Sequence, residues 1–295
     1  MKFNWKRLGL VLGLSTALFA AGCGSSGEEE TGDDASTTGG EVELAYVQWD
    51  TEIASTHVIG KVLEDLGYDV KLTALDNAIM WEAVANGEAD AMVSAWLPLT
   101  HGSQFDQYGD KMIDLGPNLE GAKIGLVVPS YMEVDSIADL TDEAGQTITG
   151  IEPGAGVVAA SERSLEDYEN MEDWQVQTSS SGAMTTELRT AYENEEEIIV
   201  TGWSPHWKFQ EFDLKYLEDP NGTFGDAETI NTMVREGLEE DDPELYQILD
   251  NFNWSVEDIE AVMLEIANGA TPEDAAAAWV EDNQDKVDEW TEGIE

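Results

Sequence analysis

The stretch VELAYVQWDTEIASTHVIGKVLEDLGYDVKLTAL, residues 42–75, decides the fold class. Its two ends, 42–49 and 68–75, are short apolar runs that predict β-strands. Between them, apolar residues recur every three or four positions over 55–66, which predicts an amphipathic helix that ends at Gly67. A strand, a helix and a strand in this order predict two parallel strands joined by a helix that covers the sheet.

The same alternation continues downstream. A helix is predicted over 78–86 and a third strand, ADAMVSAW, over 89–96. The strand KIGLVVP, 123–129, is expected to cross into a second lobe, and LKYLED, 214–219, to lead back. The second lobe repeats the pattern, with elements predicted over 147–156, 157–169, 174–179, 182–193 and 197–203. From residue 226 onward the chain is predicted to be helical.

These elements predict an α/β chain with two lobes, each built on a parallel-core sheet with flanking helices. We expect 41–125 and 220–295 to form lobe I and 126–219 to form lobe II. Two lobes that the chain crosses twice enclose a cleft that can close on a ligand. In sheets of this kind the ligand lies at the carboxyl ends of the strands.

The N-terminal segment is predicted to lie outside the fold. Three basic residues precede an apolar run, 8–21, that is too short to span a bilayer, and small residues follow it before Cys23. This pattern resembles a bacterial lipoprotein signal, residues 1–23, with Cys23 as the lipidated residue after cleavage. Residues 24–40 contain no aliphatic or aromatic side chain larger than alanine and predict a flexible acidic tether. We therefore expect a lipid-anchored protein on the extracytoplasmic face of the cell membrane.

Acidic residues dominate the composition. Sixty-three Asp and Glu stand against 13 Lys and Arg, for a formal net charge of −50. Nucleic acid is excluded as a partner, because its phosphates would be repelled. The acids are spread along the whole chain, which is typical of exported proteins kept soluble in concentrated salt. A salt-tolerant bacterial source is the expectation.

Three tryptophans lie where short apolar strands are predicted to end: Trp49, Trp96 and Trp203. Strand ends of two lobes meet at the cleft, so the three indoles can converge there. Indole faces suit a cation that donates no hydrogen bond, namely a quaternary ammonium group. The alternative is that these residues belong to the core, since the chain has ten Trp to place.

A second group of residues suits an anion. The stretch GIEPGAGV, 150–157, runs from a predicted strand into a predicted helix, and the glycines let backbone N–H groups approach a ligand. It lacks the features of phosphate and dinucleotide loops, which leaves a small carboxylate or a packing role. His101, just after a strand end, could hold the same carboxylate. For His57 a structural or surface role is expected, and for His206 that role and a place in the site remain equally open.

Other chemistries find little support in the sequence. No pair of histidines has the short spacing of common zinc motifs, so neither a metal nor another cofactor is expected. No Gly-x-Ser-x-Gly elbow is present, and the only cysteine belongs to the signal. A catalytic carboxylate pair does not stand out among 63 acids. We predict a binding protein and not an enzyme.

Four motifs carry a resemblance to a known family: YVQWDTEIASTHVIGKVLEDLGYDV, MVSAWLPLTH, GIEPGAG and IIVTGWSPHWKFQEFDLKYLEDP. Over about 44–293 the chain resembles the glycine betaine substrate-binding lipoproteins of ABC osmoprotectant importers, which have a type II periplasmic-binding-protein-like fold. The resemblance implies a prism of Trp49, Trp96 and Trp203 around the trimethylammonium group. It also implies that the amides of Gly156 and Val157, together with the His101 side chain, hold the carboxylate.

The resemblance implies two partners, a betaine as ligand and the permease of an ABC importer. Choline, carnitine or another quaternary amine is the alternative ligand. Choline has no carboxylate and would leave the donors of 150–157 and His101 without an anion.

Overall fold

The computed structural model describes residues 39–294, and two β-sheets organise them. The first sheet has the strand order β2, β1, β3, β9, β4. Its strands are β1 (Glu41–Tyr46), β2 (Asp69–Ala74), β3 (Ala91–Leu97), β9 (Glu228–Arg235) and the first part of β4 (Met112–Pro129). The second sheet has the order β4, β7, β5, β6, and β8 also pairs with β4. These strands are β5 (Thr147–Thr149), β6 (Gln175–Gln177), β7 (Ile199–Ser204) and β8 (Leu214–Tyr216).

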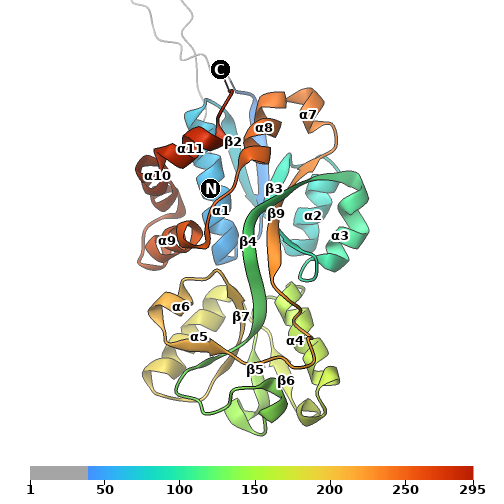
Figure 1. Ribbon diagram of the computed structural model, residues 1–295, viewed down its shortest axis with the longest axis vertical. Helices are drawn as coiled ribbons and strands as arrows, with labels where there is room; N and C mark the ends of the chain where they lie inside the picture. The colour runs from blue at the N-terminus through green and yellow to red at the C-terminus, as the bar shows by residue number, and fades with distance from the viewer. Residues whose placement is uncertain (1–38, 295) are drawn as a thin grey trace, which may run out of the picture. The chain divides into compact units, whose positions relative to one another are not determined.

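Strand β4 is shared by the two sheets and joins the two lobes. Its residues 112–122 pair with β9, and residues 123–129 pair with β7 and β8. In Figure 1 this single long strand runs from the upper lobe into the lower one, with β9 beside its first part. The chain returns after β8 through residues 217–227 into β9.

Helices cover both sheets. The first lobe carries α1 (Asp50–Asp65), α2 (Asn77–Ala85), α3 (Gly102–Tyr108), α7 (Leu238–Asp241), α8 (Pro243–Asn251), α9 (Val256–Ala267), α10 (Pro272–Asp282) and α11 (Gln284–Trp290). The second lobe carries α4 (Gly156–Asp167), α5 (Ser181–Glu193) and α6 (Lys208–Glu211). Short 3-10 turns occur at Gly109–Lys111, Ile137–Asp139, Glu143–Gln146 and Glu169–Met171.

The predicted parallel cores are present. Strands β1 and β2 pair in parallel, as do β1 and β3, and in the second sheet β5 pairs in parallel with both β6 and β7. Strands β4 and β9 add antiparallel pairings to these cores. The α/β prediction of two parallel-core sheets with flanking helices is confirmed.

The expectation that the chain is helical from residue 226 onward is wrong for its first segment. Residues 228–235, ETINTMVR, form strand β9, which lies between β3 and β4. Four of these eight residues are β-branched, and a strand with a partner on each side gains ladder hydrogen bonds that an isolated helix of this length cannot match.

Helix α1 begins five residues earlier than predicted. Strand β1 ends at Tyr46, and Trp49 is the residue that precedes the helix, with extended backbone angles of φ −104° and ψ 148°. Asp50 and Glu52 lie in the first turn, where negative charge is favourable beside the partial positive charge of the helix end. Trp49 therefore projects from a helix N-terminus and not from the end of a strand.

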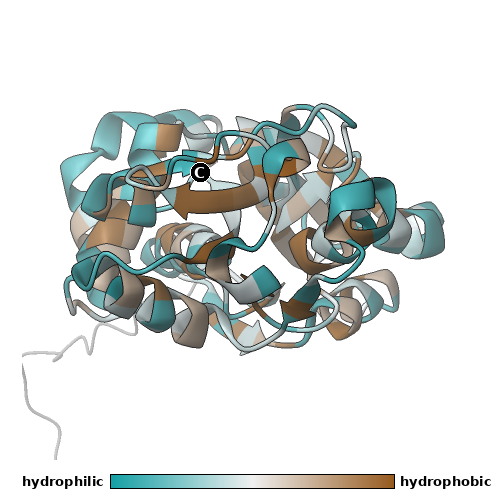
Figure 2. Ribbon diagram, turned by 90° about the horizontal axis from the view of Figure 1, so that it is seen from below, coloured by the Kyte–Doolittle hydropathy of each residue, from teal (hydrophilic) through white to brown (hydrophobic). Residues whose placement is uncertain are grey.

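The buried core follows the strands. In Figure 2 many strand segments are brown, and the teal, hydrophilic residues lie mostly on the outer helices and loops. Strand β3 is buried along its entire length, which explains its near-continuous apolar sequence. Among residues 39–294 no helix combines the length and apolar composition that a bilayer-spanning segment needs.

Candidate functional site

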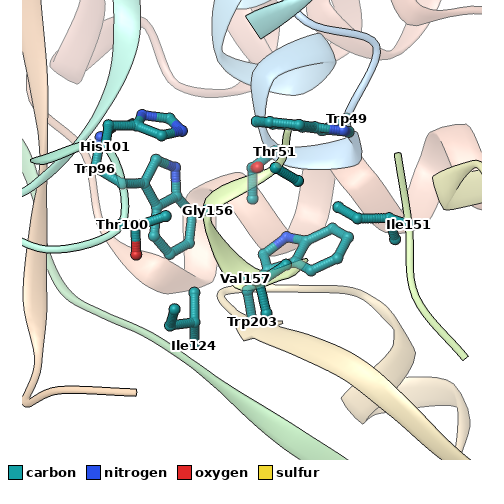
Figure 3. Close-up of a pocket in the computed structure, with 11 residues that line it drawn as sticks. Trp49, Thr51, Trp96, Thr100, His101, Ile124, Ile151, Gly156, Val157 and Trp203 are labelled. Atoms are coloured by element: carbon teal, nitrogen blue, oxygen red, sulfur yellow. Dashed lines mark hydrogen bonds between the residues drawn. The ribbon is translucent and has the colours of Figure 1, made fainter. Parts of the chain in front are cut away.

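All six residues predicted to bind the ligand line one pocket between the two lobes. The first lobe contributes Trp49, Trp96 and His101, and the second contributes Gly156, Val157 and Trp203. Figure 3 shows the three indoles around a common space, with the His101 ring next to Trp96. The enclosed cavity volume is about 30 Å³.

The three tryptophans reach the pocket from three different elements. Trp49 precedes α1, Trp96 lies in β3, and Trp203 lies in β7. Each is buried, with at most 8% of its surface exposed. The polar edge of Trp49 is also satisfied, because Nε1 donates to Glu152 Oε2 at 3.0 Å. The Trp49 ring is thus tied to the second lobe by its own polar edge.

His101 is a neutral hydrogen-bond donor. Its Nδ1 accepts the backbone N–H of Trp96 at 3.1 Å, so the ring proton resides on Nε2. Burial lowers the pKa of His101 to about 4, which keeps the imidazole uncharged near neutral pH. Within residues 39–294 its Nε2 has no hydrogen-bond partner. A buried donor without an acceptor, at the wall of a pocket, is suited to an acceptor that the ligand brings.

The second-lobe side of the pocket presents backbone amides. Gly156 and Val157 are the first two residues of α4, and the first turn of a helix leaves its N–H groups without intrahelical acceptors. The positive end of the helix dipole adds to this preference for an anion. Three indoles together with these amide and imidazole donors in one pocket make a site for a zwitterion.

Gly156 also permits a close approach of the two lobes. A Cβ atom at this position would lie 2.6 Å from Thr100 Cγ2 and 2.9 Å from the Thr100 carbonyl carbon. Thr100 belongs to the loop between β3 and α3, on the opposite lobe. The absence of a side chain at Gly156 is therefore a requirement of this closed arrangement.

The loop that carries Thr100 and His101 is fixed from β9. Buried Glu228 accepts the N–H groups of Leu99 and Thr100 at 2.6 and 2.8 Å, and its second oxygen contacts the Thr100 hydroxyl. The tight turn thus satisfies its amides without water, and His101 enters the pocket at a defined place.

The other two histidines lie outside the pocket lining. His57 Nδ1 lies 2.7 Å from the carbonyl of Ile53, one turn earlier in α1, which fits the expected structural role. His206 is fully buried, and its Nε2 lies 3.5 Å from Asp50 Oδ2 on the opposite lobe. A place for His206 in the ligand pocket was left open by the sequence, and the structure does not put it there.

Sequence reasoning missed five further lining residues and the polar contacts between the lobes. The additional lining residues are Thr51, Thr100, Ile124, Ile151 and Ala155. Most of them neighbour a predicted residue in the chain, so proximity to the motifs was the available signal. Ile124, from the crossing strand β4, had no such signal.

Buried Glu52 supports the segment that leads to Trp49. Its Oε2 accepts the N–H of Val47 at 2.6 Å, and burial raises its pKa to about 8. The folded protein therefore holds a proton that the unfolded chain releases above about pH 4.5, so this side chain costs increasing stability as pH rises from about 4.5 to 8.

Replacing Glu52 with glutamine should remove that pH-dependent cost. We expect Glu52→Gln to raise the free energy of unfolding at pH 8 by about 3 kcal/mol and to change it much less at pH 5. Urea denaturation at the two pH values measures the difference. The exposed Glu64→Gln on the same helix is the control. Equal effects of Glu52→Gln at both pH values would show that the buried carboxyl is not protonated.

Within the described part of the chain, no three His, Cys, Asp or Glu side chains are grouped so that they could hold a metal ion. The donors at the pocket are instead amides, an imidazole and hydroxyl groups.

Comparison with known proteins gives concordant matches. Residues 40–282 match the family described as the substrate-binding domain of ABC-type glycine betaine transport systems. The glycine betaine/carnitine transport binding protein GbuC of Listeria monocytogenes is 50% identical over 162 residues, which are 55% of this chain. The aligned part spans about half of that relative's length, 54%.

Two solved structures are similar over most of the described chain. Lactococcal OpuAC, in a closed conformation with glycine betaine, is 57% identical with a TM-score of 0.84, covering 85% of this chain and 99% of that one. A choline-binding protein of an ABC transporter, in complex with choline, is 27% identical with a TM-score of 0.80, covering 86% of this chain and 92% of that one.

Proposed function

We propose the ligand, partner and location of this protein from one premise: the chain belongs to the family of substrate-binding domains of ABC-type glycine betaine transport systems. The protein captures glycine betaine, and related betaines, in the pocket between its lobes and delivers it to the permease of an ABC importer. The observation that carries this proposal is the convergence of three indoles and a set of carboxylate donors in one pocket.

The indoles suit the cationic end of the ligand. A trimethylammonium group keeps its charge at every pH and offers no N–H, so hydrogen-bond acceptors cannot hold it. Trp49, Trp96 and Trp203 offer π-faces instead, each worth about 0.5–2 kcal/mol to a desolvated cation. The charge of −50 is not needed for this attraction, since the ligand is a zwitterion without net charge.

The amides and the imidazole of the pocket suit the carboxylate end. The N–H groups of Gly156 and Val157 and Nε2–H of His101 are the donors we assign to it. Choline, the alternative ligand, carries a hydroxyl group in place of the carboxylate. It would leave these three donors without an anionic acceptor. GbuC is named for carnitine as well as glycine betaine, which makes carnitine a second betaine to test.

Removal of the imidazole should separate the two ligand classes. His101→Ala is expected to weaken glycine betaine binding by about 1–3 kcal/mol, because a charge-assisted hydrogen bond is lost. Choline binding, where it is measurable, should change much less. Calorimetric titrations of the wild type and of His101→Ala, each with glycine betaine and with choline, give the comparison. An equal loss for the two ligands would assign His101 to packing.

One set of titrations tests the proposed function directly. Wild-type protein is titrated with glycine betaine, proline betaine, carnitine and choline under the same conditions. We expect glycine betaine or proline betaine to bind more tightly than choline. Tighter binding of choline would overturn the assignment of the carboxylate donors.

The remaining assignments follow the family. As a transport protein the chain needs no catalytic residue, and we propose that it performs no reaction. We propose that Cys23 carries a lipid anchor on the extracytoplasmic face of the cell membrane, although this residue lies outside the described part of the chain. We keep 41–125 with 220–295, and 126–219, as the proposed bounds of lobes I and II.

A further inference from the structure

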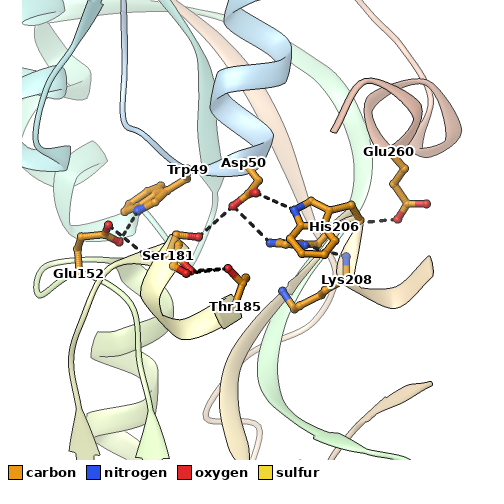
Figure 4. Close-up of polar contacts among 10 residues, drawn as sticks. Trp49, Asp50, Glu152, Ser181, Thr185, His206, Lys208 and Glu260 are labelled. Carbon is orange, nitrogen blue, oxygen red and sulfur yellow. Dashed lines mark hydrogen bonds and ion pairs between the residues drawn. The ribbon is translucent and has the colours of Figure 1, made fainter. Parts of the chain in front are cut away.

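The residue that follows Trp49 in the chain points away from the ligand pocket. Asp50 is the first residue of α1 in the first lobe, and it does not line the pocket. Its carboxylate instead meets side chains of the second lobe, as Figure 4 shows. Consecutive residues thus serve two different surfaces, Trp49 the pocket and Asp50 the contact between the lobes.

Two second-lobe side chains donate hydrogen bonds to the Asp50 carboxylate, and a third lies beside it. Trp207 Nε1 donates to Oδ1 at 2.7 Å, and the Ser181 hydroxyl donates to Oδ2 at 2.9 Å. His206 Nε2 lies 3.5 Å from Oδ2. His206 Nδ1 accepts the backbone N–H of Lys208, so the proton of its neutral ring resides on Nε2 and faces the carboxylate. Within the described residues His206 Nε2 completes no hydrogen bond, so the carboxylate is held by two hydrogen bonds with the imidazole beside them.

The charge state of this cluster favours an ionised Asp50. Burial alone would raise the pKa of Asp50, but the contacts with His206, Trp207 and Ser181 lower it below its usual range. Burial lowers the pKa of His206 to about 4. Lys208 is also fully buried, and its Nζ, 4.1 Å from the centre of the Trp203 ring, has no hydrogen-bond partner among the described residues. Burial lowers the pKa of Lys208 to about 7, and the nearby charge of Asp50 opposes this shift.

A second interlobe bond joins this cluster to the pocket. Trp49 Nε1 donates to Glu152 Oε2, and the other oxygen of Glu152 accepts the N–H of Ser181 at 3.2 Å. Ser181, at the start of α5, therefore touches both carboxylates, one from each lobe. Placement of the cage residue Trp49 and docking of Asp50 occur in the same closed arrangement.

We propose that Asp50 is the latch of lobe closure: its carboxylate docks on Ser181, Trp207 and His206 of the second lobe and sets how long a ligand stays trapped. Because the latch does not touch the ligand, it acts equally on every ligand that the closed protein holds. The choice of glycine betaine and choline as ligands rests on the proposed function. The docking of Asp50 on the second lobe does not depend on it.

Asp50→Asn is the main test, with glycine betaine and choline as probes. The variant keeps the shape of the side chain but loses the charge and one acceptor. We expect the dissociation rate of glycine betaine to rise about tenfold, with little change in the association rate. The equilibrium affinities for glycine betaine and choline should fall by the same factor. Asp76→Asn, at the exposed residue that precedes α2, is the matched control and should change neither.

A double-mutant cycle tests the partner. Ser181→Ala removes one donor and should cause a smaller loss of the same kind. The loss in Asp50→Asn combined with Ser181→Ala should be less than the product of the single losses, because both changes break one contact. Multiplicative losses, or a loss for glycine betaine without one for choline, would overturn the latch.

Amide hydrogen exchange without ligand separates this proposal from the proposed function. Residues 47–53 and 179–185 face each other only when the lobes meet, so their amides should exchange faster in Asp50→Asn than in the wild type. Equal exchange would overturn the latch even if glycine betaine binds as proposed. Failure of the wild type to bind either probe would overturn the proposed function. The exchange experiment, which needs no ligand, would still test whether Asp50 acts as the latch.

Discussion

Replacement of Trp96 by alanine is expected to weaken glycine betaine binding by about 10- to 100-fold while the protein stays folded. The change removes one aromatic face from the cation and opens the pocket to water, so the remaining indoles act on a solvated charge. Trp96 lies in the fully buried strand β3, and some loss of stability accompanies the change. Calorimetric titration with glycine betaine, together with a thermal melt, separates the two effects. Trp49→Ala and Trp203→Ala should each weaken binding at least tenfold.

Trp279 provides the control for a buried indole outside the pocket. It stacks on Trp290 with ring centres 5.5 Å apart, in an aromatic cluster of the C-terminal helices. Trp279→Ala should lower the melting temperature and leave the affinity of the folded protein nearly unchanged. Normal betaine affinity in Trp96→Ala with an unchanged melt would show that the three indoles do not form the cation site.

The parallel cores could be predicted because their signals are local. The alternation of apolar strands and amphipathic helices over 42–96 is sufficient to order the elements along the chain. Strand β9 was not predicted, because ETINTMVR has no alternating pattern of apolar and polar residues. The strand is buried on both faces between β3 and β4. Its neighbours come from more than a hundred residues away, and only the assembled sheet shows that they are there.

The pocket residues that could be predicted from the sequence are of types that are unusual at their positions. A tryptophan near a strand end and a glycine-rich turn before a helix stand out, and Trp49, Trp96 and Gly156 are found together. Carboxylates do not stand out in this chain, where 63 of them are present. Asp50, which contacts the opposite lobe, and Glu228, which fixes the loop before His101, could be recognised only from their hydrogen bonds.

A single methyl group at Gly156 should have an effect as large as the loss of an indole. In Gly156→Ala the new Cβ would meet the backbone and side chain of Thr100, which cannot withdraw because Glu228 holds its N–H and hydroxyl groups. The lobes must then stop short of the closed position, and the amides of Gly156 and Val157 no longer reach the carboxylate together with His101. Since forced overpacking costs about 1–3 kcal/mol, we expect a loss of affinity approaching 100-fold.

The clash at Gly156 arises between lobes, and that fact makes the prediction specific. The ligand-free protein can relieve it by opening, so the melting temperature without ligand should remain close to that of the wild type. Calorimetric titration gives the affinity, and small-angle X-ray scattering at saturating glycine betaine should give a larger radius of gyration than in the wild type. Gly182→Ala, in the first turn of α5 with open space around its Cβ position, is the control and should behave as the wild type. Wild-type affinity in Gly156→Ala would mean that glycine betaine is held without the close approach of Gly156 to Thr100, and the carboxylate would then need other donors.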